Sequence, residues 1–538
     1  MATFYGSTSD KKDRISTSIT SFESEYEDSN PFADLKVADY YRDLYESTKY
    51  ECRHVFDPLY EWSRSEEQEV IKILDFRVAL MACIMFAGLQ IDRGNLGQAI
   101  SDNFLDDLGL SIENYNSGNT IFLVCFILAE LPSQLLSKKF GPDIFVPTQM
   151  VAWSIVAICQ SAITGKWTFY FTRGLIGALE GGFVAELVLW LSYFYKSTEL
   201  PIRLSWFWST LSLVQIATHL MAYFVLRLRG CFGIEGWRWL FAVEGLITLA
   251  IGAVSYNLMV PLAVHTRTAF SPHGWFTEKE EKIVVNRVLR DDPSKGDMNN
   301  RESLTLASIV KSLLDFDLWP IYTIGLIAFI PTGAVDKYLA VTLRNMGFST
   351  FSTNLLAIPH QILHTVLLLW VTKLSERIGQ KALLAFVVPL WTIPLIGILA
   401  FWRNSMTNTW GTWLVTTLLL GGPYIHAICV AWVSRNANSI RSRTVGSAVY
   451  NMMVQIGGIL SANIYRQEDA PVFRQGNKKL FIIAIAFIPV LLFTKVYYIV
   501  RNRQKSQKWS SMSLEERDHY MRTTKDSGNK RLDFQFAH

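Results

Sequence analysis

The sequence predicts an all-α membrane protein with twelve transmembrane helices arranged as two six-helix bundles. Half of the residues are apolar, 13% are aromatic and the mean hydropathy is +0.20 despite long polar tails. A water-soluble chain of this size does not normally show such a composition. Apolar windows long enough to cross about 30 Å of hydrocarbon recur twelve times, six on each side of a polar insert.

The expected spans lie at residues 78–98, 116–136, 144–163, 168–191, 204–226, 239–259, 318–339, 352–372, 382–401, 410–431, 444–464 and 479–500. They divide the chain into an N-terminal tail (1–77), a first bundle (78–261), a central loop (262–317), a second bundle (318–500) and a C-terminal tail (501–538).

The N-terminal tail does not resemble a cleaved signal peptide, because about 75 polar residues precede any apolar run. It is rich in Ser, Thr and acidic residues up to Asn30. This composition predicts disorder, with a short amphipathic helix over Tyr60–Ile73 lying at the membrane interface.

An even number of spans places both tails and the central loop on one side of the membrane. Basic residues next to the outermost spans, such as Lys72, Arg77, Arg501 and Arg503, favour the cytosol for that side. The plasma membrane is the preferred location, with a vacuolar or endoplasmic reticulum membrane as alternatives.

Several function classes are disfavoured. A formal charge of +4 with no basic stripe argues against nucleic-acid binding. The six cysteines show no metal-ligand spacing, so no metal or cofactor is expected. There is no phosphate-binding G-x-x-x-x-G-K-[ST] and no catalytic signature, so we expect no enzyme and no ATP-driven pump, but a carrier driven by a gradient.

The strongest functional signal is Asp92-Arg93-Gly94-Asn95 within the first expected span. Charge inside the membrane is costly, so such residues usually face a cavity through which ions or substrates pass; the alternative is a structural ion pair between helices. Arg93 lies 16 residues after Arg77, or about 24 Å along a helix, in the outer half of the membrane. Its guanidinium can bind a carboxylate through two hydrogen bonds. The neighbouring Asp92 points about 100° away from Arg93 around the helix. Its expected role is structural or in proton coupling.

Two short basic turns occupy equivalent places in the two halves: Ser137-Lys-Lys-Phe-Gly-Pro-Asp143 follows the second span and Ser375-Glu-Arg-Ile-Gly-Gln-Lys381 follows the eighth. They resemble the loop motif of the major facilitator superfamily, and the resemblance covers all twelve spans. Leu89-Gln-Ile-Asp-Arg-Gly-Asn-Leu-Gly97, Glu199-Leu-Pro-Ile-Arg203 and Gly236-Trp-Arg-Trp-Leu-Phe-Ala-Val-Glu-Gly245 resemble the fungal allantoate-permease branch of anion:cation symporters. That branch implies a small, often anionic nutrient such as a ureide, a carboxylate vitamin or a sulfonate.

A wider resemblance concerns mechanism. Arg93-Gly-Asn-Leu-Gly97 and Arg173-Gly-Leu-Ile-Gly-Ala-Leu-Glu-Gly181 look like segments of animal organic-anion transporters. The resemblance implies that Arg93 binds the substrate anion and that Glu180 senses protons. The arginine which that group carries in the seventh span has no counterpart here, and nearby Lys337 is its expected substitute. The alternative for Glu180 is a permanent pair with a basic residue of another helix.

Other polar residues within the spans complete the predicted set. Asn95 is expected to contact substrate, and so are Asn451 and Gln455, which could equally hold helices together. Glu130, Glu186 and Arg173 are expected to act as gating or structural charges.

The sequence therefore favours a monomeric importer that couples protons to uptake of a small organic anion by alternating access. An exporter of drugs or metabolites is the nearest alternative. A nutrient receptor that binds without transporting is a second one.

Overall fold

A computed structural model describes residues 30–33, 35–47, 50–196, 199–267, 271–293, 310, 313–378, 380–403, 408–437, 440–523, 528–532 and 534–538. These residues divide into two compact units. The smaller unit joins Met1–Arg77 to Leu191–Pro201 and Val260–Arg301, and the larger unit contains the rest of the chain. Residues 1–29 of the predicted disordered tail, and parts of the central loop, lie outside the described residues.

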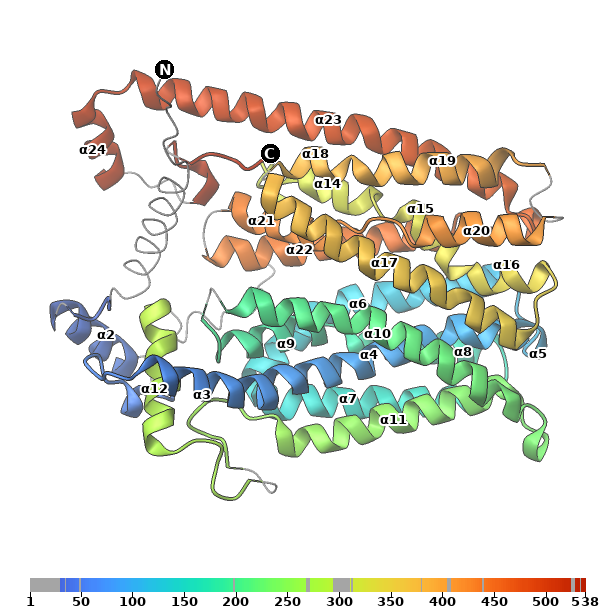
Figure 1. The fold of residues 1–538 in the computed structure, drawn as a ribbon, viewed down its shortest axis with the longest axis horizontal. Helices are drawn as coiled ribbons and strands as arrows, with labels where there is room; N and C mark the ends of the chain where they lie inside the picture. The colour runs from blue at the N-terminus through green and yellow to red at the C-terminus, as the bar shows by residue number, and fades with distance from the viewer. Residues whose placement is uncertain are drawn as a thin grey trace, which may run out of the picture. The chain divides into compact units, whose positions relative to one another are not determined.

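The larger unit is helical, as predicted. Its N half consists of α4 (Leu80–Ile100), α5 (Phe104–Asp107), α6 (Ile112–Phe140), α7 (Pro142–Cys159), α8 (Lys166–Glu180), α9 (Phe183–Ser192), α10 (Leu200–Val225) and α11 (Gly236–Leu258). Its C half consists of α14 (Trp319–Ile327), α15 (Ile330–Lys337), α16 (Leu339–Asn345), α17 (Thr350–Ile378), α18 (Lys381–Ala385), α19 (Val387–Phe401), α20 (Thr409–Leu420), α21 (His426–Ala437), α22 (Ile440–Ala462), α23 (Arg474–Ser511) and α24 (Leu514–Thr523) (Figure 1).

Each of the twelve expected spans overlaps one or more of these helices. Among the described residues, eight helices are long and apolar enough to cross a membrane, and a ninth span results if α14 and α15 are joined to α16 across a bend of 40°. The three remaining expected spans correspond to α4, α6, and α20 with α21. Charged residues interrupt the apolar run of α4, and residues 421–425 separate α20 from α21. The predicted fold class is confirmed.

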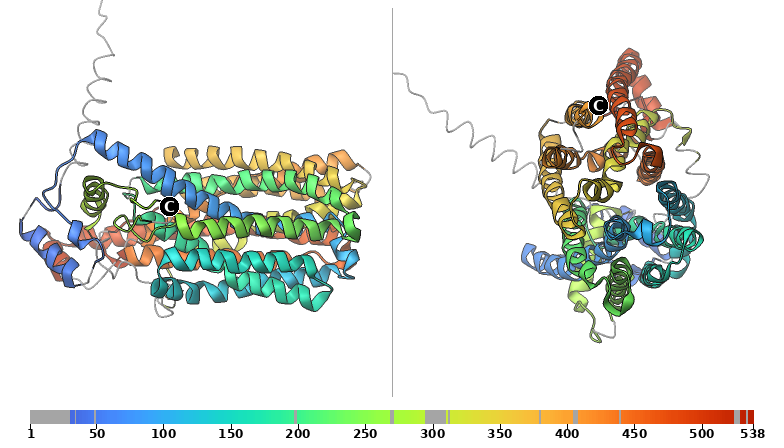
Figure 2. Two further views of the ribbon diagram at one scale, coloured as in Figure 1. Left: turned by 90° about the horizontal axis from the view of Figure 1, so that it is seen from below. Right: turned by 90° about the vertical axis from the view of Figure 1, so that its right-hand side faces the viewer.

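The two halves form two neighbouring groups of helices, which Figure 2 shows along the helix axes. In the N half α7 and α4 pack on α11, and α6 packs on α8; in the C half α19 packs on α23 and α22 on α14 and α21. The halves meet where α6 lies along α22 and where α4 reaches α16. This is the contact at which an alternating-access carrier holds its substrate.

Gly177 and Gly181 bring the end of the α8 segment close to α6, and their spacing matches a small-xxx-small packing surface. A Cβ added to Gly177 would lie 2.3 Å from the carbonyl oxygen of Phe122, so only glycine permits this approach. Gly182 has φ +83°, which side-chain-bearing residues rarely adopt, and it separates α8 from α9. The fourth span is therefore broken directly after Glu180.

The smaller unit contains α2 (Leu35–Ser47), η1 (Arg53–Val55), α3 (Arg64–Leu74) and α12 (Glu278–Asp291). Asn286 of α12 donates to the carbonyl of Val55 at 3.0 Å and accepts from the amide of Asp57 at 2.8 Å. The described part of the tail, residues 30–77, is thus folded against the central loop, which corrects the expectation of disorder there. The predicted helix at Tyr60–Ile73 corresponds to α3, and its position at a membrane interface stays a prediction.

Candidate functional site

The candidate site centres on an ion pair between the first and fourth spans. Nε of Arg93, on α4, donates to Oε2 of Glu180, the last residue of α8, at 2.7 Å. The Glu180 side chain is fully buried, whereas a quarter of the Arg93 side chain is exposed. The guanidinium carbon also lies 4.9 Å from the Phe126 ring centre. The two residues that the sequence singles out for anion binding and proton sensing are therefore direct partners.

Arg173 adds a second buried cation. Its guanidinium carbon lies 4.4 Å from the ring centre of Phe122, and that of Arg93 lies 5.9 Å from the same ring. Cation–π contacts of this kind stabilise a charge away from water. Arg173 also interacts electrostatically with Glu180. With two arginines and one glutamate, the cluster carries a surplus of positive charge when Glu180 is ionised.

Hydrogen bonding within this cluster is incomplete. In the described part of the chain, Nη2 of Arg93, Nε of Arg173 and Oε1 of Glu180 are buried and have no hydrogen-bond partner. Leaving such groups unbonded inside a protein costs free energy. An anion with two or more oxygens at this place would satisfy the two guanidinium donors.

Asp92 and Asn95 lie on other sides of α4 and form no hydrogen bond with Arg93 or Glu180 among the described residues, although Asp92 interacts electrostatically with Glu180. Asp92 is buried and accepts a hydrogen bond of 3.0 Å from Nε1 of Trp153 on α7. Asn95 follows Arg93 by two residues, about 200° around the helix, so the structure does not bring it to the guanidinium. Its amide atoms have no hydrogen-bond partner among the described residues.

The C half contributes the other predicted polar residues. Nζ of Lys337, at the end of α15, donates to the carbonyl of Gly458 on α22 at 3.0 Å. Lys337 also interacts electrostatically with Arg173, across the contact between the halves. Asn451 and Gln455 lie on α22, the helix that packs along α6. Oδ1 of Asn451 is buried without a hydrogen-bond partner in the described structure.

The predicted gating residues differ in their surroundings. Oε2 of Glu186 accepts a hydrogen bond of 2.6 Å from the hydroxyl of Ser137, the first residue of the basic turn after the second span. This contact ties α9 to the end of α6. Glu130 is buried in α6 and forms no ion pair within the described ranges.

Two further features concern Glu244 and His426, which the sequence offers as a titratable carboxyl and a histidine within the spans. Glu244 on α11 is fully buried with both carboxylate oxygens unbonded among the described residues, and it interacts electrostatically with Asp92. An aromatic cluster surrounds His426, whose ring centre lies 5.5 Å from that of Tyr450 on α22 and 6.1 Å from that of Trp208 on α10. The sequence signal for this cluster is the break Gly421-Gly422-Pro423, because interrupted spans at corresponding places in two halves point to a transporter's binding site.

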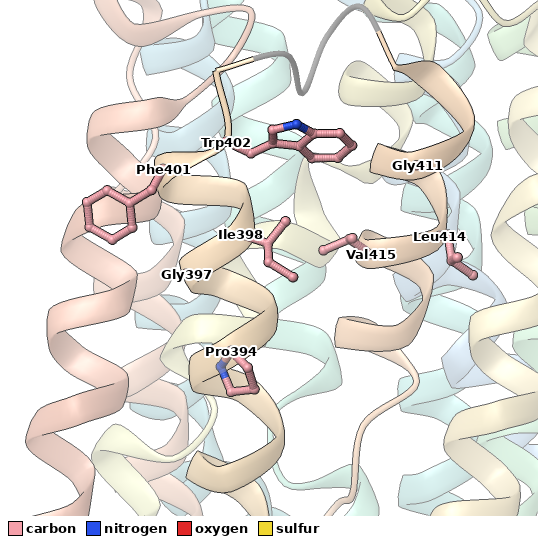
Figure 3. Close-up of a pocket in the computed structure, with 8 residues that line it drawn as sticks. All are labelled: Pro394, Gly397, Ile398, Phe401, Trp402, Gly411, Leu414 and Val415. Atoms are coloured by element: carbon pink, nitrogen blue, oxygen red, sulfur yellow. The ribbon is translucent and has the colours of Figure 1, made fainter.

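A pocket of about 670 Å³ lies between α19 and α20, and none of the residues of the ion pair lines it (Figure 3). Its lining contains no charged residue: Pro394, Gly397, Ile398, Phe401, Trp402, Gly411, Leu414 and Val415. Phe401 and Leu414 are exposed on the outside of the bundle. The pocket offers no charged side chain that would bind an anion. The described residues also include no cluster of metal-binding side chains.

Comparison with known proteins agrees with this architecture. The sequence model of the Major Facilitator Superfamily matches residues 80–462. An uncharacterised transporter of Saccharomyces cerevisiae is 42% identical over 532 residues, which are 98% of each chain. The major facilitator-type transporter hxnP of Emericella nidulans is 27% identical over 414 residues, covering 76% of this chain and 81% of its own.

Solved structures share the fold at low sequence identity. A bacterial homologue of the human drug peptide transporters aligns with a TM-score of 0.57 at 14% identity, over 80% of this chain and 99% of the homologue. The xylose transporter XylE from E. coli aligns with a TM-score of 0.53 at 15% identity, over 78% of this chain and 97% of its own.

Proposed function

Because the chain belongs to the major facilitator superfamily and is a secondary transporter of small molecules, we propose that it takes up a small organic anion together with protons. The observation that carries this proposal is the contact between Arg93 and Glu180. It joins the group best suited to bind an anion to the group best suited to carry a proton.

Coupling follows from competition for one guanidinium. When Glu180 is ionised it occupies Nε of Arg93, and a substrate anion must share that charge. When Glu180 is protonated it no longer attracts Arg93, so the guanidinium is free to hold the anion. Proton binding and anion binding therefore favour each other, and thermodynamic linkage makes the effect reciprocal.

Net charge supports the same scheme. The empty site holds Arg93, Arg173 and an ionised Glu180, and the loaded site adds one proton and one monovalent anion. The sum is unchanged, so neither form places an additional charge in the membrane as the two halves rock. Glu180 is assigned the proton in preference to Asp92, because Asp92 has its contact with Trp153 and not with Arg93.

We also propose a substrate class, contacts from the C half, an oligomeric state and a membrane. The substrate is a ureide, a carboxylate vitamin or a sulfonate, as in the allantoate-permease branch. Lys337, Asn451 and Gln455 contribute from the C half. The protein acts as a monomer in the plasma membrane with both termini in the cytosol.

The test is uptake in a host that lacks its own permeases, with single nitrogen, sulfur and vitamin sources. For the substrate so found, Arg93→Lys should raise the concentration for half-maximal uptake about tenfold or more, since lysine keeps the charge and loses the two-pronged geometry. Arg229→Lys is the matched control, because Arg229 pairs with Asp102 and Asp107 away from the site. Near-normal affinity in Arg93→Lys would remove Arg93 from the substrate site.

A further inference from the structure

The C-terminal segment returns to the C half and does not extend away from it. After α24, residues 528–532 and 534–538 lie back along α21 and α23, and the chain end is marked beside these helices in Figure 1. α21 is the second part of the broken tenth span, and α23 contains the twelfth span. All of these elements belong to the larger unit.

Two asparagines each hold the backbone of one residue in this segment. Asn502 of α23 donates to the carbonyl of Phe536 at 2.8 Å and accepts from its amide at 2.7 Å. Asn436 of α21 donates to the carbonyl of Ala537 at 3.2 Å and accepts from its amide at 2.9 Å. Nε1 of Trp432 donates to the same carbonyl at 2.7 Å. The segment is therefore bound through its backbone, as an added strand is bound at the edge of a sheet.

The side chain of Phe536 completes the attachment. It is 2% exposed, and its ring stacks on Tyr498 with centres 5.3 Å apart. Lys505 is buried beneath the segment, where its ammonium lies 4.8 Å from the Phe536 ring centre and donates to the carbonyl of Arg531 at 2.8 Å. Asn529 of the same segment donates to Asp315, just before the seventh span, at 2.8 Å. Removing the segment would take these partners from the buried Lys505 ammonium and the buried Asn436 amide, which is costly.

We infer that residues 528–532 and 534–538 form a clasp, seated in a peptide-binding groove between α21 and α23. The clasp holds α21 against the twelfth span. Because residues 421–425 separate α20 from α21, the two helices are not one continuous helix, and α20 does not fix the position of α21. The clasp supplies that fixation, so that α21 and α23 move as one body when the C half rocks. This inference is independent of which substrate the protein carries.

Native cysteines report on the clasp. Cys429 lies on α21 and is 1% exposed, and Cys52, in the smaller unit, is also 1% exposed. Mass spectrometry of the full-length protein after reaction with N-ethylmaleimide gives the labelling rate of each. Phe536→Ala should speed labelling of Cys429 about tenfold or more, while Cys52 keeps its wild-type rate. The matched control is Gln535→Ala, because the Gln535 side chain is exposed and bonds only to Ser506 at 3.1 Å.

A second arm tests the groove itself and guards against misfolding of the first variant. A chain that ends at residue 523 should label Cys429 rapidly, and a synthetic peptide of residues 528–538 added in solution should restore protection. A peptide in which alanine replaces Phe536 should not. Unchanged labelling of Cys429 in both Phe536→Ala and the truncated chain would overturn the inference. Rapid labelling that the peptide fails to reverse would also overturn it, because it would show general loosening without a groove.

Discussion

Replacing Glu180 by glutamine tests whether the central ion pair carries the coupled proton. The amide has the shape of a protonated carboxyl group but cannot release a proton. We expect net accumulation of substrate against its gradient to collapse in this variant. Exchange of internal for external substrate should persist, because exchange does not require the empty carrier to lose its proton.

The structural cost of the change can be bounded from the pair's geometry. Removing one partner of a buried ion pair costs about 3–5 kcal/mol. The cost here should be lower, about 1–3 kcal/mol, for two reasons. A quarter of the Arg93 side chain is exposed, and the amide oxygen of glutamine can still accept from Nε at the present 2.7 Å separation. The folded carrier should therefore remain measurable.

The assay measures both fluxes in reconstituted vesicles, each normalised to folded carrier. Glu235→Gln is the matched control: Glu235 is a carboxyl that also pairs with an arginine, Arg238, at 2.6 Å, but it precedes α11 and lies outside the expected spans. The control should keep pH-driven accumulation. Preserved accumulation in Glu180→Gln would refute the proton assignment, and parallel loss of exchange and folded protein would identify a structural pair.

Three further predictions concern the parts around the site. Asp317 is partly buried, but two bonds from Arg501, at 2.8 and 3.0 Å, hold its pKa below the usual range. Because the pKa of Asp317 is lowered in the folded protein, this stabilisation is present above about pH 4 and is lost below it. Asp317→Asn should therefore lower the thermal unfolding temperature at pH 7. A difference in unfolding temperature between wild type and variant that is as large at pH 3 as at pH 7 would contradict this. Arg287 is fully buried and donates to Glu199 at 2.8 Å and to the carbonyl of Phe194 at 2.9 Å. Arg287→Met should lower the yield of folded protein, as measured by size-exclusion chromatography, because both acceptors lose this buried donor; an unchanged yield would argue against the pairing. Deleting residues 2–29 should leave vesicle transport unchanged, since a polar, Ser- and Thr-rich segment has no apolar face for the bundle; lost activity in vesicles would show that it acts on the carrier.

The fold was predictable because the bilayer leaves few alternatives. A chain in hydrocarbon must satisfy its backbone hydrogen bonds internally, so each long apolar run becomes a helix. The breaks at Gly182 and at Gly421-Gly422 were less visible, because window averages over a span do not register two glycines. The folding of residues 30–77 was missed for a different reason. That segment is polar and gains its partners from α12, more than 200 residues away, through contacts such as that between Tyr45 and Pro293 at 2.7 Å.

The candidate site was predictable in its residues but not in its contacts. Arg93 was identifiable because charge within a span is rare, and Glu180 because of a resemblance in motif. Their pairing depends on the tertiary packing that brings α4 within reach of the end of α8, which local sequence does not encode. The same reason explains why Asn95, adjacent to Arg93 in the chain, lies on nearly the opposite side of the helix.

The fourth spans of the two halves show why charge gathers in the N half. Glu180-Gly181-Gly182 ends α8, and Leu420-Gly421-Gly422 follows the same pattern at the end of α20. Each break leaves the last carbonyls of a helix without intrahelical partners, and these carry partial negative charge. In the N half the residue before the break is Glu180, and Nε of Arg93 donates to its carboxylate at 2.7 Å. In the C half a leucine takes the equivalent place, and aromatic rings surround the break instead. Under the proposed coupling, protonation of Glu180 removes this partner and frees the Arg93 guanidinium for the substrate anion.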